Sequence, residues 1–284
     1  HWIMDSFCFS LFPHTEVIYN FRQMQKLKNQ LLASAQTYLL PILSGILIGT
    51  TYIPFFPWAL AFCLVPLWIF WHKNQNSYKK LWIGSWITQF ILNLIGFHWV
   101  AHTASEFGGF PPFVSYIILI LFASTAHLYF AFAAIIWSWL SRRTHEKIAW
   151  LFIPLCFAFC ELINPTIFFW HLGYPWLWIQ LPGSHVAEWI GFYGLNLVTL
   201  AINLLIVLFV LSRKPKYIFL AAALFASINA TGLVLQKRAE QNKNFDQQLH
   251  ILVVQANIGN AIKVEQEKGA YFHDYILRKF LELT

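Results

Sequence analysis

A succession of long apolar segments constrains the fold of this chain more than any other feature. A helix needs roughly 20 mainly apolar residues to cross a bilayer, and candidate segments follow one another over residues 31–235. They are Leu31–Tyr52, Phe55–Trp71, Leu81–Val100, Phe113–Leu140, Ile148–Leu162, Ala187–Leu211 and Tyr217–Leu235. With 58% hydrophobic and 11% charged residues, the composition lies outside the range of soluble globular proteins. The sequence therefore predicts an all-α polytopic membrane bundle with about seven transmembrane helices.

The basic residues orient this bundle, because Lys and Arg accumulate in short cytoplasmic loops. They precede the first segment or follow the second, fourth and sixth: Arg22, Lys26, Lys28, Lys73, Lys79, Lys80, Arg142, Arg143, Lys147, Arg213, Lys214 and Lys216. The opposite connections, residues 53–54, 101–112 and 164–186, contain no Lys or Arg. Seven spans from a cytoplasmic start would place residue 236 onward outside the cytoplasm. Since the net charge of +7 is divided among separate loops, we expect no nucleic-acid partner.

The two ends of the chain read differently from the membrane region. Residues 1–30 are interpreted as an N-terminal extension. A short basic start at Met24 precedes the first span, so residues 1–23 are either upstream translation or an extension. Residues 236–284 contain a predicted strand over Leu249–Ile258 and a mostly helical pattern over Ala261–Leu283. One strand and one helix cannot bury both faces of a sheet. We therefore expect the opening of an incomplete α/β domain, or an arm that docks elsewhere.

Glu161 is an acidic residue within a predicted span, and it lies near the outer end of the fifth. An ionisable group at such a depth usually faces the bundle interior, a cavity or the interface. Two interpretations follow. The carboxylate either forms hydrogen bonds with the next loop or faces a substrate.

The cysteines and histidines indicate neither a metal site nor a disulfide. Cys156 and Cys160 are one helical turn apart, but no histidine joins them on that helix, so packing is the expected role. Three of the four cysteines fall in apolar spans, where disulfides and reactive thiolates are not expected. The histidines at the outer edge need no ligand to explain them: His98, His102, His171 and His185.

The outer connections are uncharged in their aromatic stretches and rich in Gly and Pro. Phe107–Pro112 is predicted to form a turn bracketed by aromatic residues, and Phe168–Trp176 fills the longest outer loop. Aromatic residues gather at membrane interfaces in general. Long amphipathic loops held against the membrane surface also suit a lipid substrate that enters sideways, with its tails in hydrocarbon and its head group outside.

Several motifs, taken in order, resemble those of the apolipoprotein N-acyltransferases, enzymes of the bacterial inner membrane. They are Gly96–Val100 followed by Phe107–Pro111, then Phe169–Tyr174, Ile190–Leu195 and Val253–Ile258. Each motif is weak alone, and their order and spacing carry the resemblance. It runs from about Leu31 to Thr284.

The resemblance implies an eight-helix bundle with a periplasmic nitrilase-like domain between the last two helices, and no cofactor. In this family a Cys thiolate takes an acyl chain from a phospholipid and passes it to the N-terminal diacylglyceryl-cysteine of a lipoprotein. The Glu of the Glu-Lys-Cys triad belongs to a Trp-Pro-Glu motif expected beyond Thr284. We therefore expect no catalytic residue here and no activity of this chain alone. It would be a fragment, or half of a split enzyme completed by a second chain.

The resemblance also assigns substrate contacts within the chain: Trp170, Tyr174, Phe107, Glu161, Gln255 and Asn257. Trp170 would contact the acyl chain or gate the portal to the active site. For Gln255 and Asn257, at the end of the predicted strand, a structural role is equally consistent. Two departures weaken the pattern, because Val264 replaces a frequent Trp and Phe169 replaces a frequent Pro.

A non-catalytic membrane protein is the alternative interpretation. The same bundle could serve as a lipid-binding scaffold or as a transporter. Transporters usually show internal repeats and charged or broken helices at mid-membrane, and neither is visible in this sequence.

Overall fold

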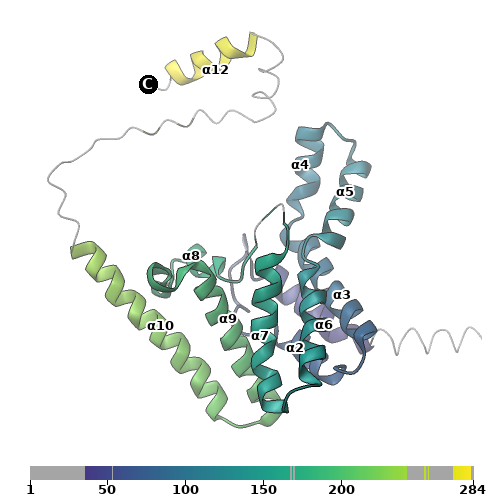
Figure 1. The fold of residues 1–284 in the computed structure, drawn as a ribbon. Helices are drawn as coiled ribbons and strands as arrows, with labels where there is room; N and C mark the ends of the chain where they lie inside the picture. The colour runs from purple at the N-terminus through teal and green to yellow at the C-terminus, as the bar shows by residue number, and fades with distance from the viewer. Residues whose placement is uncertain are drawn as a thin grey trace, which may run out of the picture.

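The computed structural model describes residues 36–52, 54–166, 168, 170–241, 253, 255 and 271–282, and these contain helices but no strand (Figure 1). The first helix covers Gln36–Gly49. The others are α2 (Val65–Lys73), α3 (Tyr78–Gly96), α4 (Trp99–Gly108), α5 (Pro112–Thr125), α6 (Tyr129–Ser141), α7 (Glu146–Ile163), α8 (Tyr174–Trp178), the 3-10 helix η1 (Pro182–Val186), α9 (Ala187–Ser212), α10 (Lys216–Gln241) and α12 (Tyr271–Leu281). Each predicted membrane segment overlaps at least one of these helices, which confirms the helical bundle.

The structure does not confirm seven spans. Within the described ranges, three helical stretches are long and apolar enough to cross a membrane: Pro112–Ser141, Pro182–Ser212 and Lys216–Gln241. The second predicted segment is irregular backbone and turns over residues 55–64, and only its last part belongs to α2, which has 9 residues. Helix α3 carries buried polar residues along its length, among them Gln89 and Asn93. These polar residues lower the mean hydropathy of α3 although their side chains face the interior of the bundle.

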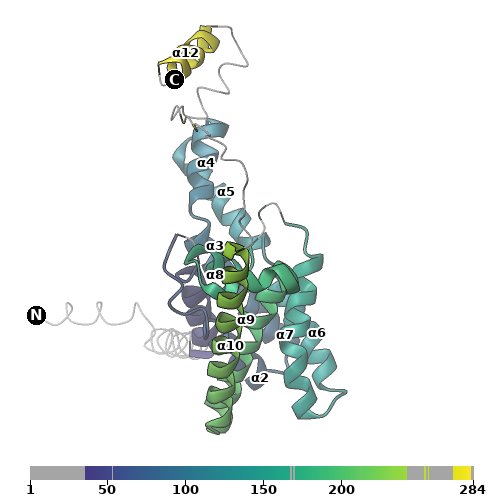
Figure 2. The same ribbon diagram turned by 90° about the vertical axis from the view of Figure 1, so that its left-hand side faces the viewer.

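A helical hairpin replaces the outer loop that was expected over residues 101–112. Helix α4 occupies most of this stretch and ends at Gly109, which has the left-handed φ of 64°. Pro112 then opens α5, a position where its missing N–H costs nothing. The predicted glycine and proline turn is confirmed, but it is the tip of a hairpin formed by α4 and α5 that extends beyond α6, α7 and α9 (Figures 1 and 2).

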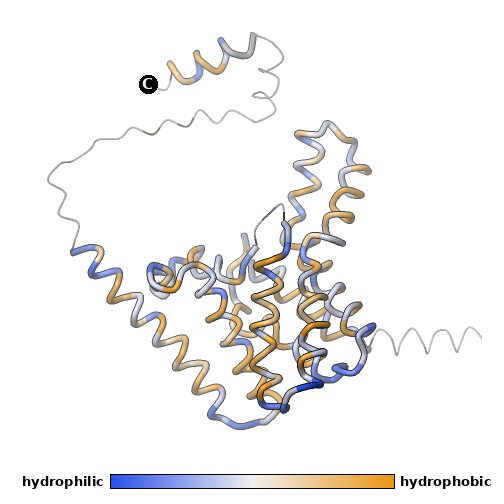
Figure 3. The backbone as a smooth tube through the Cα atoms, in the orientation of Figure 1, coloured by the Kyte–Doolittle hydropathy of each residue, from blue (hydrophilic) through white to orange (hydrophobic). Residues whose placement is uncertain are grey.

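The basic connections gather at the end of the bundle opposite this hairpin. The α6–α7 and α9–α10 connections lie there in both views and are hydrophilic (Figure 3). The α2–α3 connection joins them, since the backbone oxygen of Gln75 accepts hydrogen bonds from Ser138 Oγ at 2.5 Å and from Arg142 Nη2 at 3.1 Å. The charge alternation along the sequence therefore corresponds to two chemically different ends of one bundle.

Polar side chains connect helices inside this apolar bundle. Asn203 of α9 accepts from Leu64 N at 3.0 Å and donates to Leu60 O at 2.9 Å, which holds the turns before α2 against α9. Thr88 of α3 donates to Pro41 O at 2.9 Å. Buried backbone groups freed from regular helices need such partners. The bonds of Asn203 therefore fix how the broken second segment packs, and the bond of Thr88 joins α3 to the first helix.

Small residues allow close packing beside these hydrogen bonds. A Cβ added to Gly45 in the first helix would lie 2.8 Å from Thr88 O and 2.9 Å from Ile91 Cβ of α3. Glycines of this kind let membrane helices approach closely. Gly45 therefore brings the Pro41 carbonyl within reach of Thr88.

The C-terminal predictions are tested only in part. The strand over residues 249–258 lies almost wholly outside the described residues, and Val253 and Gln255 belong to no helix or strand. Helix α12 falls within the helical pattern predicted over residues 261–283 and confirms that part. The nitrilase-like domain stays a prediction.

Replacing Asn203 with Leu should destabilise the bundle. The change removes bonds to Leu64 N, to Leu60 O and to Thr199 O at 3.0 Å. At about 0.6 kcal/mol for each interhelical bond, we expect a loss of about 1–2 kcal/mol. Thermal unfolding in detergent measures it. The control is Asn76→Leu at an exposed turn position, and equal melting temperatures for the two variants would contradict the role of Asn203.

Candidate functional site

A buried carboxylate anchors the loop that follows α7. Glu161 Oε1 lies 2.6 Å from His171 Nδ1, and Glu161 Oε2 accepts a hydrogen bond from Asn196 Nδ2 of α9. The three residues are buried, with only 7% of Glu161 exposed. Both carboxylate oxygens therefore have protein partners, which favours the interpretation of Glu161 as a group that holds the loop.

Local sequence explains how the loop reaches Glu161. Helix α7 ends where Asn164 adopts an extended conformation before Pro165, which cannot continue a helix. The chain then returns across α9, and Leu172 O accepts from Thr199 Oγ1 at 3.4 Å. Gly173 permits this approach, because an added Cβ would lie 3.2 Å from the ring of Phe192.

Trp170 lies in the middle of an aromatic cluster at this loop. It is 2% exposed, and its ring centroid lies 5.5 Å from that of Tyr52, 5.7 Å from that of His127 and 6.3 Å from that of Phe130. Tyr52 also contacts Tyr174, with ring centroids 6.2 Å apart. The loop and the end of the first helix thus form one aromatic wall.

A second polar group positions the other side of this wall. His127 Nδ1 donates to Asn93 Oδ1 at 2.6 Å, and His127 N donates to Gln89 Oε1 at 3.0 Å. Since an amide oxygen only accepts, Nδ1 carries the proton. His127 lies at the break between α5 and α6, so two amides of α3 set the place where its ring meets Trp170.

The break itself leaves backbone carbonyls without helical partners, and side chains from elsewhere supply donors. Asn93 Nδ2 donates to Ala123 O at 3.2 Å, and Gln89 Nε2 donates to Ser124 O at 3.0 Å. Asn164, just after α7, donates to Ala126 O at 3.2 Å. The carbonyls at the break therefore have defined hydrogen-bond donors, which fix its conformation.

Three buried polar atoms around the site have no hydrogen-bond partner among the described residues. They are His127 Nε2, Tyr129 Oη and Asn196 Oδ1. The rings of His127 and Tyr129 lie 5.9 Å apart, and Asn196 binds Glu161. Because buried polar atoms are almost always paired, these unpaired atoms set the cluster apart from ordinary core packing.

The structure brings together three of the residues predicted for the site. Trp170, Tyr174 and Glu161 share one cluster through Tyr52 and His171. The other predicted positions lie apart from it or outside the description. Phe107 lies on α4 and is 47% exposed, Gln255 is exposed, and Asn257 falls outside the described residues.

Sequence reasoning missed several members of this cluster. Asn196 is one of two amides in the apolar helix α9, and such residues usually mark interhelical hydrogen bonds. His171 was placed only at the outer edge, and Tyr52 and His127 carried no local signal. Ring contacts formed by residues far apart in the chain cannot be read from spacing.

The arrangement is suited to binding and positioning. Among the residues that the structure describes, no three His, Cys, Asp or Glu side chains meet as a metal site requires. Cys63, Cys156 and Cys160 are buried, so none has the partly exposed, electropositive setting of a nucleophile. What the cluster offers is an aromatic wall with buried polar groups.

Comparison with known proteins places this bundle in a family. Residues 44–205 match the family model described as the apolipoprotein N-acyltransferase N-terminal domain. An apolipoprotein N-acyltransferase of Bdellovibrio bacteriovorus is 44% identical over 252 residues, which cover 86% of this chain and 45% of that protein. One from Pasteurella multocida is 26% identical over 81% of this chain and 45% of its own length.

A further relative, apolipoprotein N-acyltransferase 2 of Leptospira interrogans, is 26% identical over 68% of this chain and 34% of its own length. The chain thus spans about half the length, or less, of the curated relatives it matches. The matched region contains the loop, Glu161 and the aromatic cluster. On these matches, the chain belongs to the apolipoprotein N-acyltransferase family.

Proposed function

We propose that this chain forms the membrane part of an enzyme that transfers a phospholipid acyl chain to the N-terminal diacylglyceryl-cysteine of lipoproteins. The observation that carries the proposal is the buried loop at Trp170, which is fixed by Glu161 and Asn196 inside a bundle of this family. An aromatic wall beside polar atoms suits a lipid with an apolar chain and a polar head.

Each residue of the cluster then has a role in binding. Trp170, which is buried in this structure, would gate the portal through which the acyl chain enters, and Tyr174 is joined to it through Tyr52. Glu161 acts through His171 and holds the loop in place. Phe107, Gln255 and Asn257 are further proposed substrate contacts outside the cluster.

The proposal includes an orientation. The chain would lie in a bacterial inner membrane with the basic connections in the cytoplasm, because Lys and Arg favour that side. The tip of the α4–α5 hairpin at Gly109 and residues from 236 onward would then face the periplasm. Such an arrangement puts the loop at Trp170 at the periplasmic side, where the lipoprotein N-terminus would meet the acyl donor.

Cysteine labelling tests this orientation. Glu106→Cys on the hairpin and Lys80→Cys near the basic connections are exposed positions, and Cys8→Ser removes the cysteine outside the described residues. In intact spheroplasts, an impermeant maleimide should label Glu106→Cys and should reach Lys80→Cys only after permeabilisation. The reverse pattern would contradict the orientation.

A chimera tests the activity. Residues 36–241 of this chain replace the matched membrane region of the Bdellovibrio bacteriovorus relative, and mass spectrometry follows acyl transfer to a synthetic diacylated lipopeptide. We expect transfer by the chimera and none by the relative without its membrane region. Lipopeptide binding with no transfer would instead favour the lipid-binding scaffold.

Trp170→Ala in this chimera should reduce kcat/KM by about tenfold or more, because small displacements of a bound substrate are costly to a reaction. Trp170→Phe keeps an aromatic surface and should recover part of the loss. The matched control is Trp139→Ala, whose side chain is exposed on α6. Equal rates for Trp170→Ala and the control would exclude Trp170 from the binding surface.

A further inference from the structure

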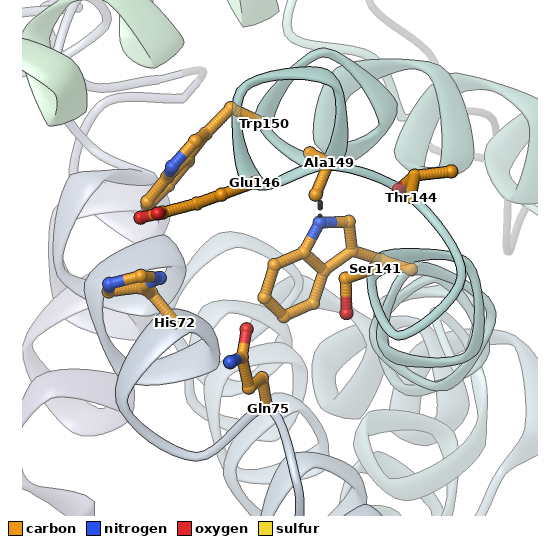
Figure 4. Close-up of a pocket in the computed structure, with 8 residues that line it drawn as sticks. His72, Gln75, Ser141, Thr144, Glu146, Ala149 and Trp150 are labelled. Carbon is orange, nitrogen blue, oxygen red and sulfur yellow. Dashed lines mark hydrogen bonds between the residues drawn. The ribbon is translucent and has the colours of Figure 1, made fainter.

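A pocket lies at the end of the bundle that carries the basic connections, away from the loop at Trp170 (Figure 4). Its cavity volume is about 330 Å³. It is formed where α2 and α6 end and α7 begins, and its lining residues are His72, Gln75, Trp137, Ser141, Thr144, Glu146, Ala149 and Trp150. None of these belongs to the site described above.

The hydroxyl groups of the pocket are left as acceptors. Ser141 Oγ donates to Ser138 O at 2.9 Å, and Thr144 Oγ1 donates to Leu140 O at 3.1 Å. Each hydroxyl has one proton and two lone pairs. Because both protons are used within the helix end, the hydroxyls can offer the cavity only their lone pairs.

Two indole groups line the pocket, and each has another ring packed against it, Trp71 against Trp137 and His72 against Trp150. Trp137 Nε1 donates to Ala149 O at 2.8 Å, so its polar atom is already paired. Trp150 packs against His72, with ring centroids 4.7 Å apart. Aromatic faces of this kind attract cations, and Trp does so most strongly.

The charged residues of the lining also favour a bound cation. Glu146 lies beside Trp150 and His72 in the close-up (Figure 4) and forms no ion pair with any residue that the structure describes. No Lys or Arg lines the pocket. Of the neighbouring arginines, Arg142 lies over Tyr78 at 4.3 Å and donates to the backbone oxygen of Gln75 at 3.1 Å, and Arg143 lies over Trp139 at 4.0 Å.

The helix ends do not oppose a cation. Helix α7 begins at Glu146 and places a partial positive charge at the pocket, but α2 and α6 both end there and place partial negative charges. The partial negative charges at the ends of α2 and α6 therefore meet one partial positive charge at the start of α7. The carboxylate of Glu146 compensates for that positive charge.

From this geometry we infer that the pocket binds a primary ammonium group, as carried by an ethanolamine lipid head group or by a small soluble amine. The ammonium has three donors for the carboxylate of Glu146, the Gln75 carboxamide oxygen and the hydroxyls of Ser141 and Thr144. The indole faces surround its charge. A quaternary ammonium has no such donors and would fit less well.

Native mass spectrometry of the purified 284-residue chain in neutral detergent tests the inference. Phosphatidylethanolamine, phosphatidylcholine and phosphatidylglycerol are titrated separately at equal concentrations. We expect phosphatidylethanolamine to bind more tightly than the other two. Glu146→Gln should weaken that binding by about tenfold, the effect of losing a hydrogen bond to a charged group.

Glu188→Gln is the matched control, because Glu188 is also an exposed acid in the first turn of a helix and is not part of the pocket. It should leave phosphatidylethanolamine binding unchanged. Thr144→Val removes one acceptor at nearly constant shape and should weaken binding by about threefold. Melting temperatures of the variants show that each is folded.

Free ethanolamine, added as a competitor, separates the two sources of the group. Displacement of the lipid at millimolar ethanolamine would assign the pocket to a soluble amine, and no displacement would assign it to the lipid head group. Equal binding of the three lipids, a preference for phosphatidylglycerol, or unchanged binding by Glu146→Gln would overturn the inference.

Discussion

A polar group inside an apolar bundle must find a partner in the protein, and this requirement organises the structure. Glu161 illustrates it, because a carboxylate left unpaired at such a position would be very costly. Its two oxygens hold His171 and Asn196, which belong to a loop and to a different helix. The aromatic wall depends on this pairing, because His171 directly follows Trp170 in the chain.

The sequence predicted those parts of the fold that depend on local pattern. The apolar segments located helices, and Gly109 and Pro112 located the tip of a hairpin. Length alone was misleading, since Phe113–Leu140 reads as one helix but is broken between α5 and α6. The break depends on Gln89 and Asn93 from another helix, so no window of local sequence contains its cause.

The same distinction applies to the candidate site. Glu161 could be singled out because an acid is rare in an apolar span, and Trp170 because it stands in a family motif. The residues that surround them could not be singled out from the sequence. Tyr52 joins Trp170 and Tyr174 across more than a hundred residues of sequence, and only the packing of the first helix against the loop brings them together.

The paired break between α5 and α6 also has a mechanical consequence. Its carbonyls are bound by donors from α3 and by Asn164, which follows Glu161 by only three residues. The corner therefore cannot flex without giving up hydrogen bonds in a medium that offers no water to replace them. A displacement of the segment after α7 would therefore displace this corner through Asn164, and the α4–α5 hairpin would move with it as one rigid unit.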